Sequence, residues 1–104
     1  MNYISLGTFN GKFLQLIGSR YVNNTISLIL LNNNVQYEEI TLYDRQTKLK
    51  EGYLLLNPNM SNELKNFLIK KNIFRLVKQD IDDSLEIAII NKKVYEKLLN
   101  NKIV

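Results

Sequence analysis

The sequence of 104 residues contains neither cysteine nor histidine. Without cysteine, the chain has no disulfide, no thiolate nucleophile and no cysteine-ligated zinc site. Without histidine, it lacks the most common general base and the most common metal ligand of proteins. Because small secreted domains often depend on disulfides, their absence favours a reducing compartment.

Long apolar runs and an export signal are missing as well. The longest nearly apolar run, Ile26–Leu31, is far shorter than the roughly 20 residues that a membrane-spanning helix needs. The first residues, Met1–Ser5, show no basic stretch followed by an apolar run, so they predict no signal peptide. We therefore expect a cytoplasmic protein that does not associate with membranes.

Length and composition are those of one ordinary globular domain. A hydrophobic share of 45% and a charged share of 23% lie close to the averages of soluble proteins. A chain of this length buries roughly 65% of the surface that it exposes when unfolded, which is enough for one core. No linker or repeat divides the sequence, so we expect a single domain over residues 1–104. Fifteen asparagines and eleven lysines suggest an A/T-rich coding sequence, as in low-GC bacteria and their phages.

The first part of the chain alternates runs of strand-forming residues with turn signals. Asn-Gly at position 10 and the three asparagines at 32–34 favour hairpin turns. The run 25–31 is apolar on both faces, which indicates a strand inside a sheet. In the run 35–43 the apolar face changes midway; a bulge near Glu38-Glu39 or a twisted edge would explain this. The predicted strands are 2–8, 11–18, 25–31, 35–43 and 53–56.

The second part of the chain predicts two helices and two strands. After a turn around Pro58, Ser61 is a typical N-cap for a helix that ends near Asn72. Strands 73–78 and 85–90 flank an acidic loop, and Asn91 caps a closing helix. The order β-β-β-β-β-α-β-β-α predicts an α+β fold with a mainly antiparallel sheet and helices on one face.

No motif in the sequence predicts catalysis or a metal site. Gly7–Phe13 differs from a phosphate-binding loop in glycine spacing and in having Phe13 where Ser or Thr should bind magnesium. Asp80–Ser84 offers oxygen ligands but lacks the glycine and glutamate of a calcium loop, so we interpret it as a solvated turn. Glu38 and Glu39 are neighbours in a strand and point to opposite faces. We expect no enzymatic activity and no cofactor.

Positive charge is the most informative feature for function. The net charge is +4, and residues 61–104 contain nine Lys or Arg against six Asp or Glu. These cations either solvate helix faces or bind a phosphate backbone or an acidic partner. Exposed tyrosine beside Arg20 suggests an interface hot spot, although tyrosine is equally common in half-buried strands. The candidate partner-binding residues are Lys65, Lys70, Lys71, Arg75, Lys92, Lys93, Lys97, Arg20 and Tyr21.

Over about residues 6–78 the chain resembles small accessory proteins that phages and plasmids of low-GC bacteria encode. The segments that carry this similarity precede a short helix and are Phe9–Gly11, Tyr21–Asn23, Thr25–Leu31, Tyr37–Leu42 and Leu49–Gly52. Such proteins include anti-CRISPR and other anti-defence inhibitors. The resemblance implies a non-enzymatic inhibitor in the cytoplasm of the host bacterial cell, which covers a functional face of a bacterial defence protein such as a CRISPR effector.

Two other functions stay open. One is a small basic DNA- or RNA-binding accessory protein, although only three arginines and no known nucleic-acid motif are present. The other is a structural or assembly protein of a phage, and a homodimer is compatible with each of these functions. A positive net charge differs from the acidic proteins that mimic DNA, so we do not expect DNA mimicry.

Overall fold

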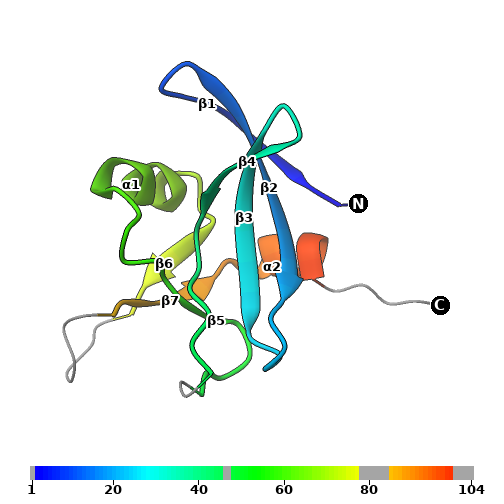
Figure 1. Ribbon diagram of the computed structural model, residues 1–104, viewed down its shortest axis with the longest axis vertical. Coiled ribbons are helices and arrows are strands. Elements are labelled where there is room, and N and C mark those ends of the chain that lie inside the picture. The colour runs from blue at the N-terminus through cyan, green and yellow to red at the C-terminus, as the bar shows by residue number, and fades with distance from the viewer. Residues whose placement is uncertain (1, 46–47, 78–84, 100–104) are drawn as a thin grey trace.

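The structure is a computed structural model that describes residues 2–45, 48–77 and 85–99. Within these ranges, seven strands and two helices follow one another in the predicted order, and all strand pairs are antiparallel (Figure 1). The prediction of an α+β fold is confirmed. The strands are β1 (Ile4–Phe9), β2 (Lys12–Arg20), β3 (Ile26–Asn32), β4 (Val35–Glu39), β5 (Tyr53–Leu55), β6 (Phe74–Leu76) and β7 (Ile87–Ile90), and the helices are α1 (Asn62–Lys70) and α2 (Lys92–Leu99).

The strands are divided between two sheets. The large sheet has the order β1-β2-β3-β4, so β3 lies inside it as predicted, and the small sheet has the order β5-β7-β6. Residues 40–42 connect them. The amide of Ile40 donates to Leu28 of β3 at 3.0 Å, the amide of Leu42 donates to Leu55 of β5 at 2.9 Å, and Thr41 pairs with Leu56. The fourth strand therefore ends at Glu39 and not at position 43, because the chain crosses there to the small sheet.

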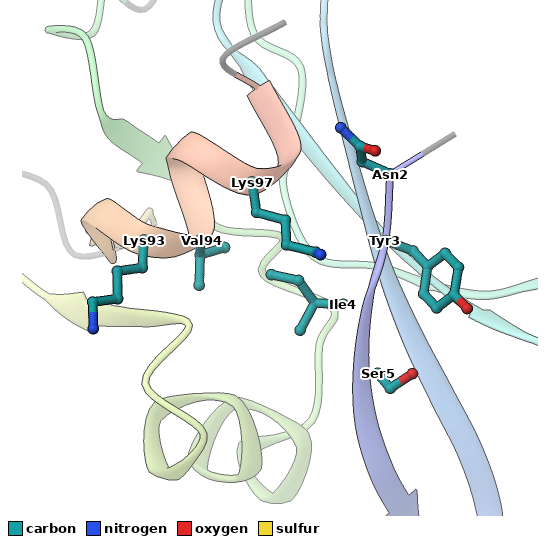
Figure 2. Close-up of a pocket in the computed structure, with 7 residues that line it drawn as sticks. All are labelled: Asn2, Tyr3, Ile4, Ser5, Lys93, Val94 and Lys97. Carbon is teal, nitrogen blue, oxygen red and sulfur yellow. The ribbon is translucent and has the colours of Figure 1, made fainter.

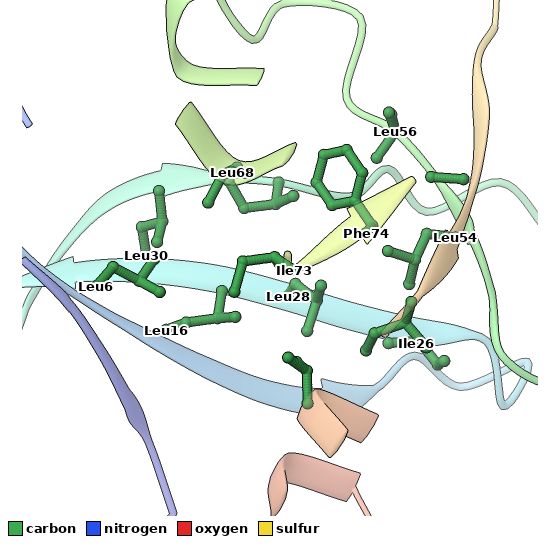
Figure 3. Packing of buried hydrophobic residues seen from close by; sticks show 14 of the residues in the cluster. Leu6, Leu16, Ile26, Leu28, Leu30, Leu54, Leu56, Leu68, Ile73 and Phe74 are labelled. Carbon is green, nitrogen blue, oxygen red and sulfur yellow. The ribbon is translucent and has the colours of Figure 1, made fainter. Parts of the chain in front are cut away.

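Alternate residues of the central strands form the core. Leu14 and Leu16 of β2 point to the same face as Leu28 and Leu30 of β3, and all four are completely buried. Side chains from both helices and from the small sheet pack on this face (Figure 3). The prediction of helices on one face of the sheet is thus correct for the large sheet.

Both helices begin at the predicted caps. The Ser61 hydroxyl accepts a hydrogen bond from the amide of Leu64 at 3.1 Å. The Asn91 side-chain oxygen accepts from the amides of Lys93 and Val94 at 2.8 and 3.3 Å. Each cap satisfies amides that have no partner within the helix, and so fixes where the helix starts.

The predicted irregularity of the fourth strand is a bulge. Leu30 pairs with Glu38 and Leu31 pairs with Gln36, so Tyr37 is an extra residue in β4. The Tyr37 side chain is half-buried and packs against the core. The predicted acidic loop, residues 79–84, lies outside the described residues.

Candidate functional site

Two of the predicted partner-binding cations are held in ion pairs within the chain. The Nη2 atom of Arg20 lies 2.6 Å from Oε2 of Glu51, and the Nζ atom of Lys65 lies 2.6 Å from Oε1 of Glu86. Lys65 joins α1 to the segment before β7, and Arg20 joins the end of β2 to the loop before β5. Both cations therefore already stabilise contacts between distant segments.

Arg20 belongs to a larger polar cluster that includes α2. Its guanidinium donates to the Tyr95 hydroxyl at 3.2 Å, and this hydroxyl donates to the Glu51 carboxylate. The hydrogen bonds from Arg20 and Tyr95 lower the pKa of Glu51, and the hydrogen bond to Glu51 raises the pKa of Tyr95. The cluster fixes α2 against the end of β2, on the flank of the helix opposite to Lys93 and Lys97.

Tyr21 is fixed at the junction between the sheets. Its hydroxyl lies 2.9 Å from the Oγ1 atom of Thr41, and its ring centroid is 5.3 Å from that of Tyr43. Thr41 is buried and also accepts a hydrogen bond from the amide of Leu28 at 3.0 Å. The Tyr21 side chain thus has a structural role, and its role in binding stays a prediction.

The other six predicted cations are exposed, and none of them forms an ion pair within the part of the chain that the structure describes. Lys71 is the only one with an aromatic contact there, since its Nζ atom lies 5.6 Å from the Phe67 ring centroid. They lie at the end of α1, on β6 and on α2. These free cations are Lys70, Lys71, Arg75, Lys92, Lys93 and Lys97.

A groove of about 590 Å³ separates α2 from the start of β1 (Figure 2). We call it the basic groove, because Lys93 and Lys97 lie on the same side of α2 and no acidic residue lines it in the part of the chain that the structure describes. Ile4 and Val94 point into the space between the two elements, and the ammonium group of Lys97 extends toward Ile4 (Figure 2). The lining residues are Asn2, Tyr3, Ile4, Ser5, Lys93, Val94 and Lys97.

The basic groove runs along the free edge of the large sheet. Ile4 and Ser5 begin β1, and Asn2 and Tyr3 directly precede it, so the groove follows the start of this strand. β1 is the outermost strand, and in the described ranges its outer edge forms no backbone hydrogen bond to another element. Lys71 also reaches this edge, since a Cβ atom at Gly7 would lie 3.7 Å from its Nζ atom.

A second hollow of about 290 Å³ lies beside the start of α2. Arg75 of β6 and Lys92 of α2 line it, together with Asn91 and the ends of β6 and β7. Most of the free cations therefore surround α2 on two adjoining sides.

Acidic and other metal-binding side chains form no cluster comparable to that of the cations among the described residues. Among the described residues, no group of three or more Asp, Glu, His or Cys is close enough to bind a metal ion. Glu38 and Glu39 pair with successive residues of β3, which places them on opposite faces as predicted. The Asp80–Ser84 segment lies outside the described residues.

A comparison of the chain with models of protein families, with curated proteins and with solved structures finds no significant match. No helix within the described ranges has the length and apolar character needed to cross a bilayer. The assignment of the candidate site therefore rests on the geometry of the described residues alone.

The sequence did not indicate that residues 2–5 belong to this site. Lys93 and Lys97 were candidates because of their charge, but their neighbours across the groove lie about 90 positions earlier in the chain. No local pattern connects segments so far apart; only the packing of α2 on β1 and β2 brings them together.

Proposed function

We propose that this protein is a non-enzymatic binding protein that inhibits a bacterial defence protein, such as a CRISPR effector, by covering one of its surfaces. The observation that carries the proposal is the gathering of free cations around α2, next to an unpaired strand edge. A cation that has no partner in its own chain is available to an anionic partner without first breaking an ion pair.

The surface is suited to binding because it is rigid. The Asn91 cap and the Arg20–Glu51–Tyr95 cluster fix both the start and the inner flank of α2. The helix that carries these cations is therefore held in place before a partner arrives, which reduces the backbone entropy lost on binding. Clustered positive charge also speeds the encounter with an acidic surface.

Inhibition is supported by the resemblance to small accessory proteins of phages and plasmids, whose anti-defence members act by occlusion. It agrees with a sequence that contains no histidine and no cysteine. Since the free cations attract anions, the proposal specifies that the covered surface of the effector is acidic.

Nucleic-acid binding is the second candidate, because the same free cations match the charge of a phosphate backbone. The two functions differ in one measurable property. Binding of random-sequence DNA or RNA would weaken steeply with salt, in proportion to the number of phosphates contacted. A protein partner would be bound with a shallower dependence on salt.

Plating of phage on a defence-positive bacterial host that expresses the protein tests the inhibitor function. The wild-type chain should restore plating, and reversal of four free cations (Arg75→Glu, Lys92→Glu, Lys93→Glu and Lys97→Glu) should abolish the restoration. A matched control reverses Lys12, Lys48, Lys50 and Arg45, which are exposed elsewhere and produce the same net charge. Equal loss in both variants, with normal far-UV spectra, would contradict the proposal.

A further inference from the structure

We propose that the basic groove binds an extended, acidic segment of the partner protein, which pairs with β1 as a fifth strand of the large sheet. This inference rests on the proposed function and specifies how the partner is held. It requires a free strand edge, cations placed beside that edge, and a reason why the segment joins β1 and not another strand.

The backbone of β1 provides the first requirement. In an antiparallel sheet, every other residue of an edge strand directs its amide and carbonyl away from the neighbouring strand. β1 pairs with β2 on one side only, with a one-residue bulge at Leu6, and no backbone bond within the described ranges occupies its other side before or after the bulge. An added strand would pair with these groups whatever its own side chains are, as in other cases of strand addition.

The side chains along the groove provide the second requirement. Lys93 and Lys97 stand on one side of α2 above residues 2–5, and Lys71 lies beside Gly7 farther along β1. Three cations thus follow the same edge, and none of the described residues that line the groove is acidic. Acidic side chains of an added strand would meet these ammonium groups, and its apolar side chains would contact Ile4 and Val94 between them (Figure 2).

The opposite edge of the large sheet is closed to such a strand. β1 and β4 each contain a bulge, at Leu6 and at Tyr37, so the two edges differ in their charge and in the groups that already engage them. The Asn57 side chain donates to the carbonyl of Glu39 at 2.9 Å and its amide donates to the carbonyl of Ile40 at 2.9 Å. The negative charges of Glu38 and Glu39 would also repel an acidic segment. β6, the edge strand with Arg75, is only three residues long.

A second copy of this chain is a poor occupant for the same reasons. The end of its most acidic strand, β4, is engaged by Asn57, and the bulges of β1 and β4 prevent one continuous regular register between two folded copies. Pairing of β4 of one copy with β1 of the next would moreover be a head-to-tail contact, which continues from copy to copy unless it closes into a ring. A separate acidic partner avoids this outcome.

The experiment uses a fluorescein-labelled peptide of ten alternating valine and glutamate residues as the probe, with the full chain as the receptor. Fluorescence polarisation measures affinity, and ¹⁵N-resolved NMR spectra locate the site. We expect the probe to shift the amide signals of residues 2–9 and 92–97. A probe with N-methyl groups on alternate residues, which cannot pair with a strand edge, should bind at least about tenfold more weakly.

Two double variants test the role of the lysines. Lys93→Glu with Lys97→Glu should weaken binding of the probe at least about tenfold, because both charges face the groove. Lys48→Glu with Lys50→Glu produces the same net charge at exposed positions in the loop before β5, away from the groove, and should weaken binding less than about threefold. Equal effects of the two variants, tight binding of the N-methylated probe, signal shifts confined to other residues, or no binding would each overturn the inference. So would self-association at the β1 edge that excludes the probe.

Failure of this inference differs from failure of the proposed function. If the wild-type chain inhibits the defence system and the Lys93→Glu/Lys97→Glu variant inhibits it equally well, the groove assignment is wrong and the inhibitor function stands. If the wild-type chain restores no plating against any defence system, the inhibitor function itself is wrong, whatever the probe binds.

Discussion

Thr41 is a single polar side chain on which both sheets depend. It is almost completely buried at 1% exposure, yet its hydroxyl bonds the amide of Leu28 and the hydroxyl of Tyr21. Its backbone pairs with Leu56 at the entrance to the small sheet. A buried donor that loses its acceptor carries the full cost of its lost hydration.

Replacing Thr41 with Val keeps the shape of the side chain and removes the acceptor of the Leu28 amide. We expect Thr41→Val to lower the free energy of unfolding by about 1–3 kcal/mol, measured by urea denaturation. Tyr21→Phe should cost less, about 0.5–1.5 kcal/mol, because the Thr41 hydroxyl still accepts from Leu28. A Thr41→Val variant as stable as the wild type would show that this hydroxyl does not hold the junction.

Glu51 makes stability depend on pH. Its pKa is lowered from 4.5 in the folded chain by the hydrogen bonds from Arg20 and Tyr95. Its contribution is therefore complete above about pH 4.5 and is lost as the pH falls through the lowered pKa. Because this ion pair is largely exposed, we expect Glu51→Gln to cost about 0.2–1 kcal/mol at pH 7.

The measurement is a series of urea unfolding curves from pH 7 to pH 2.5. The difference between wild type and Glu51→Gln should shrink as the pH falls below 4.5. Glu96→Gln, on the exposed side of α2, should change stability less at pH 7. A Glu51→Gln difference that stays constant over this range would rule out the ionised carboxylate as the stabilising group.

At the scale of elements, Gly18 permits the close approach of α2 to the large sheet. A Cβ atom at this position would lie 3.1 Å from Cβ of Leu98 and 3.4 Å from Cδ2 of Leu28. The first of these distances is shorter than most contacts between side chains, so a larger residue would push the helix away from β2. The width of the basic groove depends on the same packing.

We expect Gly18→Val to destabilise the protein by about 1–3 kcal/mol in urea denaturation, despite the strand preference of valine. Ser19→Val is the matched control, because Ser19 is exposed in the same strand on the other face. If the two variants are equally stable, α2 does not need the space at position 18.

Local sequence signals predicted the helices and strands, whereas contacts between distant segments determine how the strands are divided between two sheets. Ser61 and Asn91 predicted where the two helices begin. The alternation of side chains along β2 identified its buried leucines. The division into two sheets was not predictable, since residues 35–43 read as one continuous strand. The pairing of Thr41 with Leu56 and the hydrogen bond from Leu42 to Leu55 direct the chain to the small sheet. For the candidate site, charge identified the lysines, whereas nothing in the sequence revealed which cations would be used in ion pairs.

At the scale of the whole molecule, one core serves both sheets. Leu28 and Leu30 of the large sheet pack in the same buried cluster as Leu54 of the small sheet and Leu68 of α1 (Figure 3). Neither sheet therefore has a core of its own, and we expect both to unfold in one cooperative transition.

Native-state hydrogen exchange tests this expectation. The slowest amides of β3 and β7 should exchange with the same free energy of opening. Leu28→Ala, at a completely buried position, should lower both values together by about 2–5 kcal/mol. Independent values for the two strands would show that the sheets are separate folding units.

The extra residues in β1 and β4 have a consequence for solubility. The two borders of the large sheet carry opposite charges, with Lys71, Lys93 and Lys97 along one and Glu38 and Glu39 along the other. Such borders attract each other, and regular strands at both borders would allow copies to stack end to end into filaments. Each border contains one inserted residue, Leu6 in β1 and Tyr37 in β4, so the borders of two copies cannot pair in one continuous regular register, and this disfavours fibre growth.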